Sequence, residues 1–98
     1  MAVVLRFAAP GFTAAKYEEV TNKLEQAGQG SPAGRLYHVC FGDKDNLRVN
    51  DIWDSRESFE KFGQTLMPIM QELGIEGEPE FFEVHNIIEG VKASTTTP

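Results

Sequence analysis

Cysteine is nearly missing from this chain, since Cys40 is the only one among 98 residues. A single cysteine excludes an internal disulfide and fits a reducing compartment, so we expect a cytoplasmic protein. Long apolar runs are missing too, because Arg6 interrupts the apolar residues 2–9 and no basic segment precedes them. These residues are therefore predicted to be neither a signal peptide nor a membrane span.

Basic side chains are also few: 9 Lys and Arg stand against 15 Asp and Glu, which gives a net charge of −6 and a pI near 4.8. They form no cluster along the chain. Nucleic acids and anionic membranes are bound through basic patches, so we expect neither partner. The two histidines and the cysteine lack the spacing of a metal site, and glycine-rich phosphate loops and nucleophile elbows are absent from the sequence. We therefore predict no metal and no cofactor.

The chain does contain four strand-like and two helix-like segments. Runs rich in apolar and β-branched residues predict strands at residues 2–8, 36–41, 47–53 and 80–88. A first helix is predicted after an N-cap at Thr13, with Tyr17, Val20 and Leu24 in its apolar stripe and Gly28 at its end.

The second helix is predicted over residues 55–73, with an apolar stripe that begins at Phe59. Asp54 and Glu57 have the spacing of an N-cap and its reciprocal partner. Pro68 lies inside the stripe and removes a backbone donor, so we expect a kink or a tightened last turn there.

The order of these segments is strand, helix, strand, strand, helix, strand. It predicts an α+β fold of the ferredoxin-like class, with one four-stranded antiparallel sheet and two helices on one face. We expect one domain over residues 1–89 and a polar tail over residues 90–98. A chain this short buries only about 60–65% of its unfolded surface, and one sheet face lacks helices. Two copies packed sheet against sheet would cover that face, which predicts a homodimeric α+β barrel.

Alternation along each strand assigns the side chains to two sheet faces. Apolar sets are assigned to the helix-covered face: Val3, Leu5, Phe7, Tyr37, Val39, Phe41, Phe82, Val84 and Ile88. The third strand is ambiguous, because Asn50 and Ile52 oppose Asp51 and Trp53. If Asp51 and Trp53 point away from the helices, the open face collects Arg6, His38, Cys40, Asp51, Trp53, Glu83 and His85.

That set has the ingredients of a small-ligand site. Histidine is the side chain that most often serves as a base near neutral pH, so His38 and His85 are the candidate catalytic bases, and Asp51 is the candidate group that fixes a histidine tautomer. The candidate substrate-binding residues are Arg6, Trp53, Phe81 and Glu83. Structural roles stay open: a strand histidine can belong to an interface, Arg6 can pair with a carboxylate, and Cys40 can be a small buried hydrophobe.

The third strand joins the second helix through Trp53-Asp54-Ser55-Arg56-Glu57-Ser58-Phe59. This junction and the overall layout resemble the dimeric α+β barrel superfamily over residues 2–88, in particular the small antibiotic-biosynthesis-monooxygenase-like proteins. The resemblance implies a cleft between sheet and helices, lined by Trp53, for an aromatic substrate that some members oxygenate without metal or flavin. The heme-degrading branch has an asparagine on its first strand and a histidine on its second helix. Here Arg6 and a second helix without histidine argue against heme degradation.

We predict a pocket between sheet and helices, walled by Trp53 and Phe81, with His38 and His85 as its polar groups. Two hypotheses about function follow. The first is a cofactor-independent monooxygenase or isomerase acting on a small aromatic or carbonyl compound, in which a neutral histidine abstracts an acidic proton. The second is a non-catalytic ligand-binding or stress-related barrel, in which the histidines only form hydrogen bonds. A pocket filled by apolar side chains would favour the second hypothesis.

Overall fold

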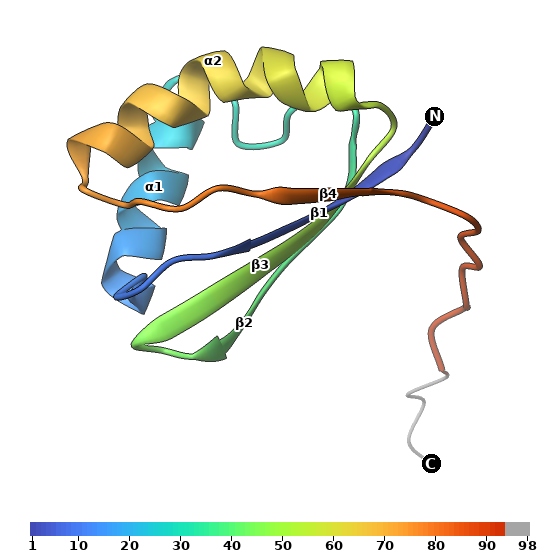
Figure 1. Cartoon of the computed structure of the whole chain (residues 1–98), viewed down its shortest axis with the longest axis horizontal. Helices are drawn as coiled ribbons and strands as arrows, with labels where there is room; N and C mark the ends of the chain where they lie inside the picture. Colours follow the sequence, from blue (N-terminus) through green and yellow to red (C-terminus); the bar gives the residue numbers. More distant parts are fainter. Residues whose placement is uncertain (94–98) are drawn as a thin grey trace.

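The structure is a computed structural model that describes residues 1–93. Its elements are β1 (Val3–Ala8), α1 (Ala14–Gln26), β2 (Arg35–Asp43), β3 (Asn46–Trp53), α2 (Arg56–Glu72) and β4 (Glu80–Glu83). The strands form an antiparallel sheet in the order β2-β3-β1-β4, and both helices lie over the same face of it (Figure 1). The predicted ferredoxin-like α+β fold is therefore confirmed. No helix within residues 1–93 is long and apolar enough to cross a membrane.

Both helices begin at a hydroxyl side chain that accepts a hydrogen bond from the first turn. Thr13 caps α1 as predicted, since its Oγ1 accepts from the backbone N–H of Lys16 at 3.2 Å. The cap of α2 is Ser55, whose Oγ accepts from the N–H of Ser58 at 3.1 Å. The prediction of Asp54 as this cap is wrong by one residue, because the extended backbone of Ser55 brings its short side chain to the exposed N–H.

The end of β4 differs from the sequence expectation. This strand covers Glu80–Glu83 instead of residues 80–88, because β1, its neighbour, begins at Val3 and offers no further backbone to pair with. After a last hydrogen bond from the N–H of Val84 to the carbonyl of Ala2, at 3.0 Å, the chain runs on beyond the sheet (Figure 1). Residues 94–98 of the predicted polar tail lie outside the described residues. The helix α2 does not end at Pro68 but continues to Glu72.

The register of the sheet shows which residues share a face, because partners paired across antiparallel strands point the same way. One row of paired residues across the sheet faces the helices and includes two polar side chains; it consists of His38, Asp51, Leu5 and Phe81. The adjacent row on the open face is apolar across all four strands and consists of Tyr37, Ile52, Val4 and Phe82.

The face predicted for β2 is therefore wrong. His38 and Cys40 point toward the helices, whereas Tyr37 is 60% exposed on the open face. The ambiguity in β3 is resolved in the same sense, since Asp51 and Trp53 are buried beneath the helices. The physical reason is that polar groups can enter the core side when they satisfy one another, as the carboxylate of Asp51 and the imidazole of His38 do.

The two faces predicted for β4 are also exchanged, because the register of β4 against β1 places the opposite set of side chains beneath the helices. Phe81 pairs with Leu5 and faces the helices, while Phe82 lies on the open face and is 49% exposed. The core side is centred on Trp53, whose ring lies 5.5 Å from that of Phe59 and 5.3 Å from that of Phe62. The apolar stripe of α2 thus packs onto the tryptophan at the end of β3.

Candidate functional site

A cavity of about 250 Å³ lies between the helices and the sheet. Its volume lies slightly below the roughly 300–1,000 Å³ that is typical of small-molecule sites. Apolar side chains from strands and helices make up most of the wall, among them Leu5, Phe12, Val20, Leu24, Phe62 and Met70. The side chains with polar groups in the wall are Tyr17, Thr21, Glu25, Arg35, His38 and Asp51. The space beneath the helices is therefore not filled by apolar side chains.

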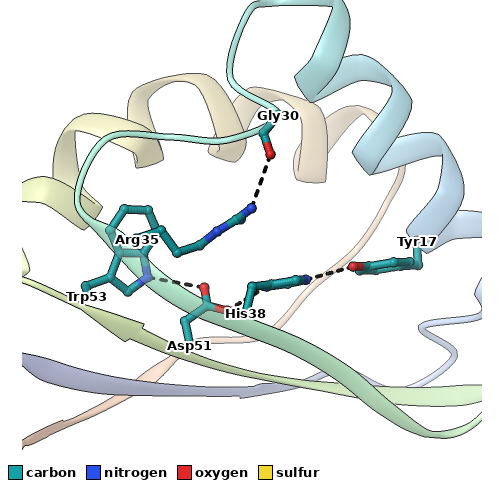
Figure 2. A network of polar contacts seen from close by, with 6 residues as sticks. All are labelled: Tyr17, Gly30, Arg35, His38, Asp51 and Trp53. Carbon is teal, nitrogen blue, oxygen red and sulfur yellow. Dashed lines mark hydrogen bonds and ion pairs between the residues drawn. The ribbon is translucent and has the colours of Figure 1, made fainter. Parts of the chain in front are cut away.

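Three of these polar side chains form one chain of hydrogen bonds along the cavity (Figure 2). The hydroxyl of Tyr17, on α1, lies 2.7 Å from Nε2 of His38, on β2. Nδ1 of His38 lies 2.6 Å from Oδ1 of Asp51, on β3. The other oxygen of Asp51 accepts from Nε1–H of Trp53 at 3.2 Å. Elements far apart in the sequence thus place one phenol, one imidazole and one carboxylate in line.

The carboxylate determines where the protons of this chain lie. Asp51 is only 5% exposed, and an ionised carboxylate can only accept hydrogen bonds. We therefore assign a proton to Nδ1 of His38, which leaves Nε2 of the neutral imidazole as an acceptor. The hydroxyl of Tyr17 then donates to Nε2, and the lone pairs of its oxygen can accept from a ligand. A proton that reaches the oxygen of Tyr17 would have a hydrogen-bonded route to Nε2 of His38.

Burial is the main factor that raises the pKa of Tyr17 above its ordinary value of 10.0. The thiolate that Cys40 forms at alkaline pH acts in the same direction, the positive charge of Arg35 lowers this pKa, and the negative charge of Asp51 raises it further. Tyr17 therefore carries its proton at neutral pH and acts as a hydrogen-bond donor. Burial also raises the pKa of the Cys40 thiol. Cys40 is then a neutral thiol rather than a nucleophile at neutral pH, and it is half-buried against the core rather than fully buried.

The raised pKa of Tyr17 predicts how stability changes at alkaline pH. The folded protein holds this proton more tightly than the unfolded chain, whose tyrosines titrate at about 10. The linked stabilisation is complete below about pH 10 and is lost as the pH rises through the higher pKa of the folded state. The Tm advantage of the wild type over Tyr17→Phe should be constant up to about pH 10 and shrink above it. Thermal unfolding by circular dichroism measures this, and a constant gap throughout would contradict the raised pKa.

Of the residues predicted from the sequence, His38 and Asp51 meet at the cavity. Trp53 lies beside them but is 0% exposed and does not line the cavity, so the wall role implied for it is not what the structure shows. It holds Asp51 from behind instead. Phe81 also lies behind the cavity wall, with its ring 5.2 Å from that of Phe59.

Arg6, Glu83 and His85 are not brought to the cavity. Arg6 alternates with Leu5 along β1, so it points to the open face and is exposed. Glu83 is exposed on the edge strand β4. His85 is exposed and follows the end of β4, where the alternation that placed it beside His38 no longer applies. The predicted grouping of the two histidines is therefore wrong.

Of the six polar residues in the cavity wall, sequence reasoning found only His38 and Asp51, and the missed residues include Tyr17 and Arg35. Helical periodicity places Tyr17 in the apolar stripe of α1, and its hydroxyl is the only sign that it also needs a polar partner. Arg35 precedes the strand predicted over residues 36–41, and a β-bulge turns it inward. No group of three or more His, Cys, Asp or Glu side chains that could hold a metal ion occurs in the described part of the chain.

No protein-family model matches this chain, and no curated protein matches it in sequence. Solved structures do match. SnoaB, a cofactor-independent oxygenase from Streptomyces nogalater, superposes with a TM-score of 0.59 and 18% identity, over 91% of this chain and 96% of that one. A provisionally assigned antibiotic biosynthesis monooxygenase from Deinococcus radiodurans superposes with a TM-score of 0.61 and 13% identity, over 94% of this chain and 100% of that one. A second such protein, from Chloroflexus aurantiacus, superposes with a TM-score of 0.59 and 19% identity, over 95% of this chain and 98% of that one.

At these identities the comparisons establish the fold. The chain has the ferredoxin-like fold of the antibiotic-biosynthesis-monooxygenase-like proteins, as the resemblance at the β3–α2 junction implies.

Proposed function

We propose that this protein is an oxygenase that acts on a small aromatic or carbonyl compound without a metal or flavin cofactor. The observation that carries the proposal is the Tyr17–His38–Asp51 chain in the wall of an otherwise mostly apolar cavity. The likeness in fold to SnoaB, a cofactor-independent oxygenase, supports the same class of reaction. Arg6, Glu83 and His85 have no part in it, since they do not line the cavity.

The first step in this proposal is a proton transfer. A substrate with an acidic O–H or C–H lies against the oxygen of Tyr17. As that oxygen takes the substrate proton, Tyr17 passes its own proton to Nε2 of His38. Asp51 stabilises the resulting imidazolium through Nδ1–H. Tyr17 thus remains neutral throughout, in agreement with its raised pKa.

The second step uses the electrons of the substrate anion. The anion transfers one electron to O₂, and the two radicals combine to a peroxide at carbon. Loss of water leaves a carbonyl, so an activated CH₂ group and O₂ become C=O and H₂O, and no external reductant is required. The apolar walls exclude water from the reactive intermediates.

Oxygen uptake tests this proposal directly. The wild-type protein is incubated with anthrone and with 2-tetralone, two ketones whose CH₂ groups are acidified by neighbouring rings or carbonyls. We expect at least one of them to be converted with one O₂ consumed per product, and with one ¹⁸O atom from ¹⁸O₂ in the new carbonyl. Binding without oxygen uptake would instead favour the non-catalytic barrel. Rearrangement of the ketone without oxygen uptake would favour an isomerase.

We also propose that two copies pair through the open sheet faces. The apolar row Tyr37–Ile52–Val4–Phe82 crosses the whole sheet, and its two outer residues are 60% and 49% exposed. Beyond the sheet, Ile88 and Val91 are 86% and 96% exposed on a segment that leaves the body of the protomer (Figure 1). A face of this kind on a small domain fits a second copy of itself, because a twofold axis brings identical apolar rows together.

A charge in the centre of this row should separate the copies. We expect the wild type to sediment at twice its mass of 10.9 kDa at micromolar concentration, and Ile52→Lys to sediment as a monomer. Gln64→Lys is the matched control, since it adds the same side chain to the exposed surface of α2 and should leave the dimer intact. A monomeric wild type, or a dimeric Ile52→Lys variant, would contradict the pairing.

A further inference from the structure

Arg35 points into the cavity because the start of β2 is irregular. Opposite Trp53 and Ile52, which are consecutive, β2 places Arg35 and Tyr37, so one extra residue is inserted. Without this bulge, alternation would put Arg35 on the open face with Tyr37, whereas the structure has it on the side of His38 (Figure 2). Bulges of this kind re-aim side chains at functional sites.

The residue before the bulge holds this geometry in place. Gly34 has a φ of 90°, and a Cβ there would lie 2.5 Å from Cβ of Ser58 and 2.8 Å from a carboxylate oxygen of Asp54. Its carbonyl accepts from the N–H of Asp54 at 2.8 Å. The backbone that leads into Arg35 is therefore fixed against the beginning of α2.

The guanidinium of Arg35 is not matched by a carboxylate. Within residues 1–93 no Asp or Glu oxygen lies within 4.0 Å of it. Its side chain donates one hydrogen bond, to the carbonyl of Gly30 at 3.2 Å, and lies over the ring of Phe62 at 5.8 Å from the centroid. A guanidinium has five N–H donors. A half-buried guanidinium with unused donors at a mostly apolar cavity is well suited to bind an anionic group of a ligand.

Among the described residues of the cavity wall, no other can pair with an anionic ligand as Arg35 can. It is the only Lys or Arg that lines the cavity in the described part of the chain. Of the two acids in the wall, Asp51 is already engaged by His38 and Trp53, and Glu25 is exposed on α1. The protein as a whole carries a charge of −6, so it would repel an anion that had no local cation to meet it.

We propose that the ligand of this cavity is an organic acid, an aromatic compound whose carboxylate pairs with Arg35 while its reacting group lies at Tyr17. The carboxylate accepts the free N–H groups of the guanidinium, and its rings occupy the apolar space beneath α2. The reaction at Tyr17 rests on the proposed function, but the pairing with Arg35 does not. Arg35 is then the residue that selects acids over neutral compounds of the same shape.

A matched pair of probes tests the selection: 1-hydroxy-2-naphthoate and 1-hydroxy-2-naphthamide have the same rings and hydroxyl but differ in charge. Isothermal titration calorimetry with the wild type should give a Kd at least about tenfold lower for the carboxylate, the contribution of one charge-assisted pair. Equal affinities, a preference for the amide, or no binding of the carboxylate at millimolar concentration would overturn the proposal.

Variants assign the preference to Arg35. Arg35→Gln should bind both probes with similar affinity, and Arg35→Lys should keep part of the preference, since it retains the charge but loses the planar fork. Arg56→Gln is the matched control: Arg56 also lies over an aromatic ring, that of Phe81 at 3.9 Å, but does not line the cavity. This control should bind as the wild type does. An undiminished preference in Arg35→Gln would overturn the assignment, and should that variant not fold, the probe pair on the wild type still decides.

The two proposals fail separately. An Arg35-dependent preference for the carboxylate, together with no oxygen uptake on any ketone, would leave an acid-binding protein that is not an oxygenase. Conversely, oxygen uptake on neutral anthrone with no preference between the two naphthalene probes would leave an oxygenase without an anion site.

Discussion

Replacing His38 by glutamine should lower kcat for oxygen uptake by about 10²–10⁴-fold, the usual contribution of general acid–base catalysis. Glutamine can still form hydrogen bonds with Tyr17 and Asp51, but it cannot take up a proton. The apolar walls are unchanged, so KM should change much less than kcat. The measurement is steady-state oxygen consumption with the ketone that the wild type converts fastest.

The control for this experiment lies two residues further along the same strand. Cys40 points to the same side of the sheet as His38, does not line the cavity and carries a neutral thiol. Cys40→Ala should therefore keep the wild-type rate. If His38→Gln kept its kcat as well, the proton relay through the imidazole would be wrong, and His38 would have only a structural role.

Replacing Trp53 by alanine should cost about 3–5 kcal/mol of unfolding free energy, the range for large aromatic-to-alanine changes in a core. Its side chain is 0% exposed and packs against the rings of Phe59 and Phe62. For a domain of this size about 1 kcal/mol shifts Tm by roughly 4–8 °C, so Tm should fall by more than about 12 °C. Trp53 is the only tryptophan, so the variant has no tryptophan fluorescence to follow. Chemical denaturation is therefore followed by far-UV circular dichroism.

Trp53→Phe separates packing from hydrogen bonding. It keeps an aromatic ring in the core but removes the N–H that donates to Oδ2 of Asp51 at 3.2 Å. We expect a loss of about 1–3 kcal/mol, typical of a buried polar group left without its partner. All comparisons are made at one protein concentration, because unfolding of the proposed dimer would depend on that concentration. A Trp53→Ala variant no less stable than Trp53→Phe would contradict this account of the core.

The hydrophobic core and the proton relay thus share one carboxylate. Asp51 accepts from Trp53 on the core side and from His38 on the cavity side. A change at Trp53 that spares the fold should still disturb the orientation of His38. Residues that surround the reacting groups of a site commonly act in this way, by holding those groups in their orientation.

Local chemistry determined the elements of this fold, and these could be predicted from the sequence. Thr13 caps α1, and the stripe of Phe59 and Phe62 forms the buried side of α2, because both features depend on residues within a few positions of one another. The order of the elements then implied the sheet with two helices on one face. His38 was recognisable as one of two candidate bases because the chain has only two histidines, and Asp51 was recognisable as a carboxylate that could orient an imidazole, but the sequence grouped His38 with His85.

Only the tertiary structure decided which side of the sheet these groups occupy. Tyr37, Val39 and Phe41 are as apolar as a core-facing set although they lie on the open face, beside Ile52, Asn50 and Arg48 of β3, so alternation alone could not tell the two faces apart. His38 enters the core side only because Asp51 meets it there from another strand. Arg35 reaches the cavity through a bulge, a feature of strand pairing that no local pattern reveals. The site therefore depends on contacts between distant segments, whereas the fold depends on signals that each segment carries by itself.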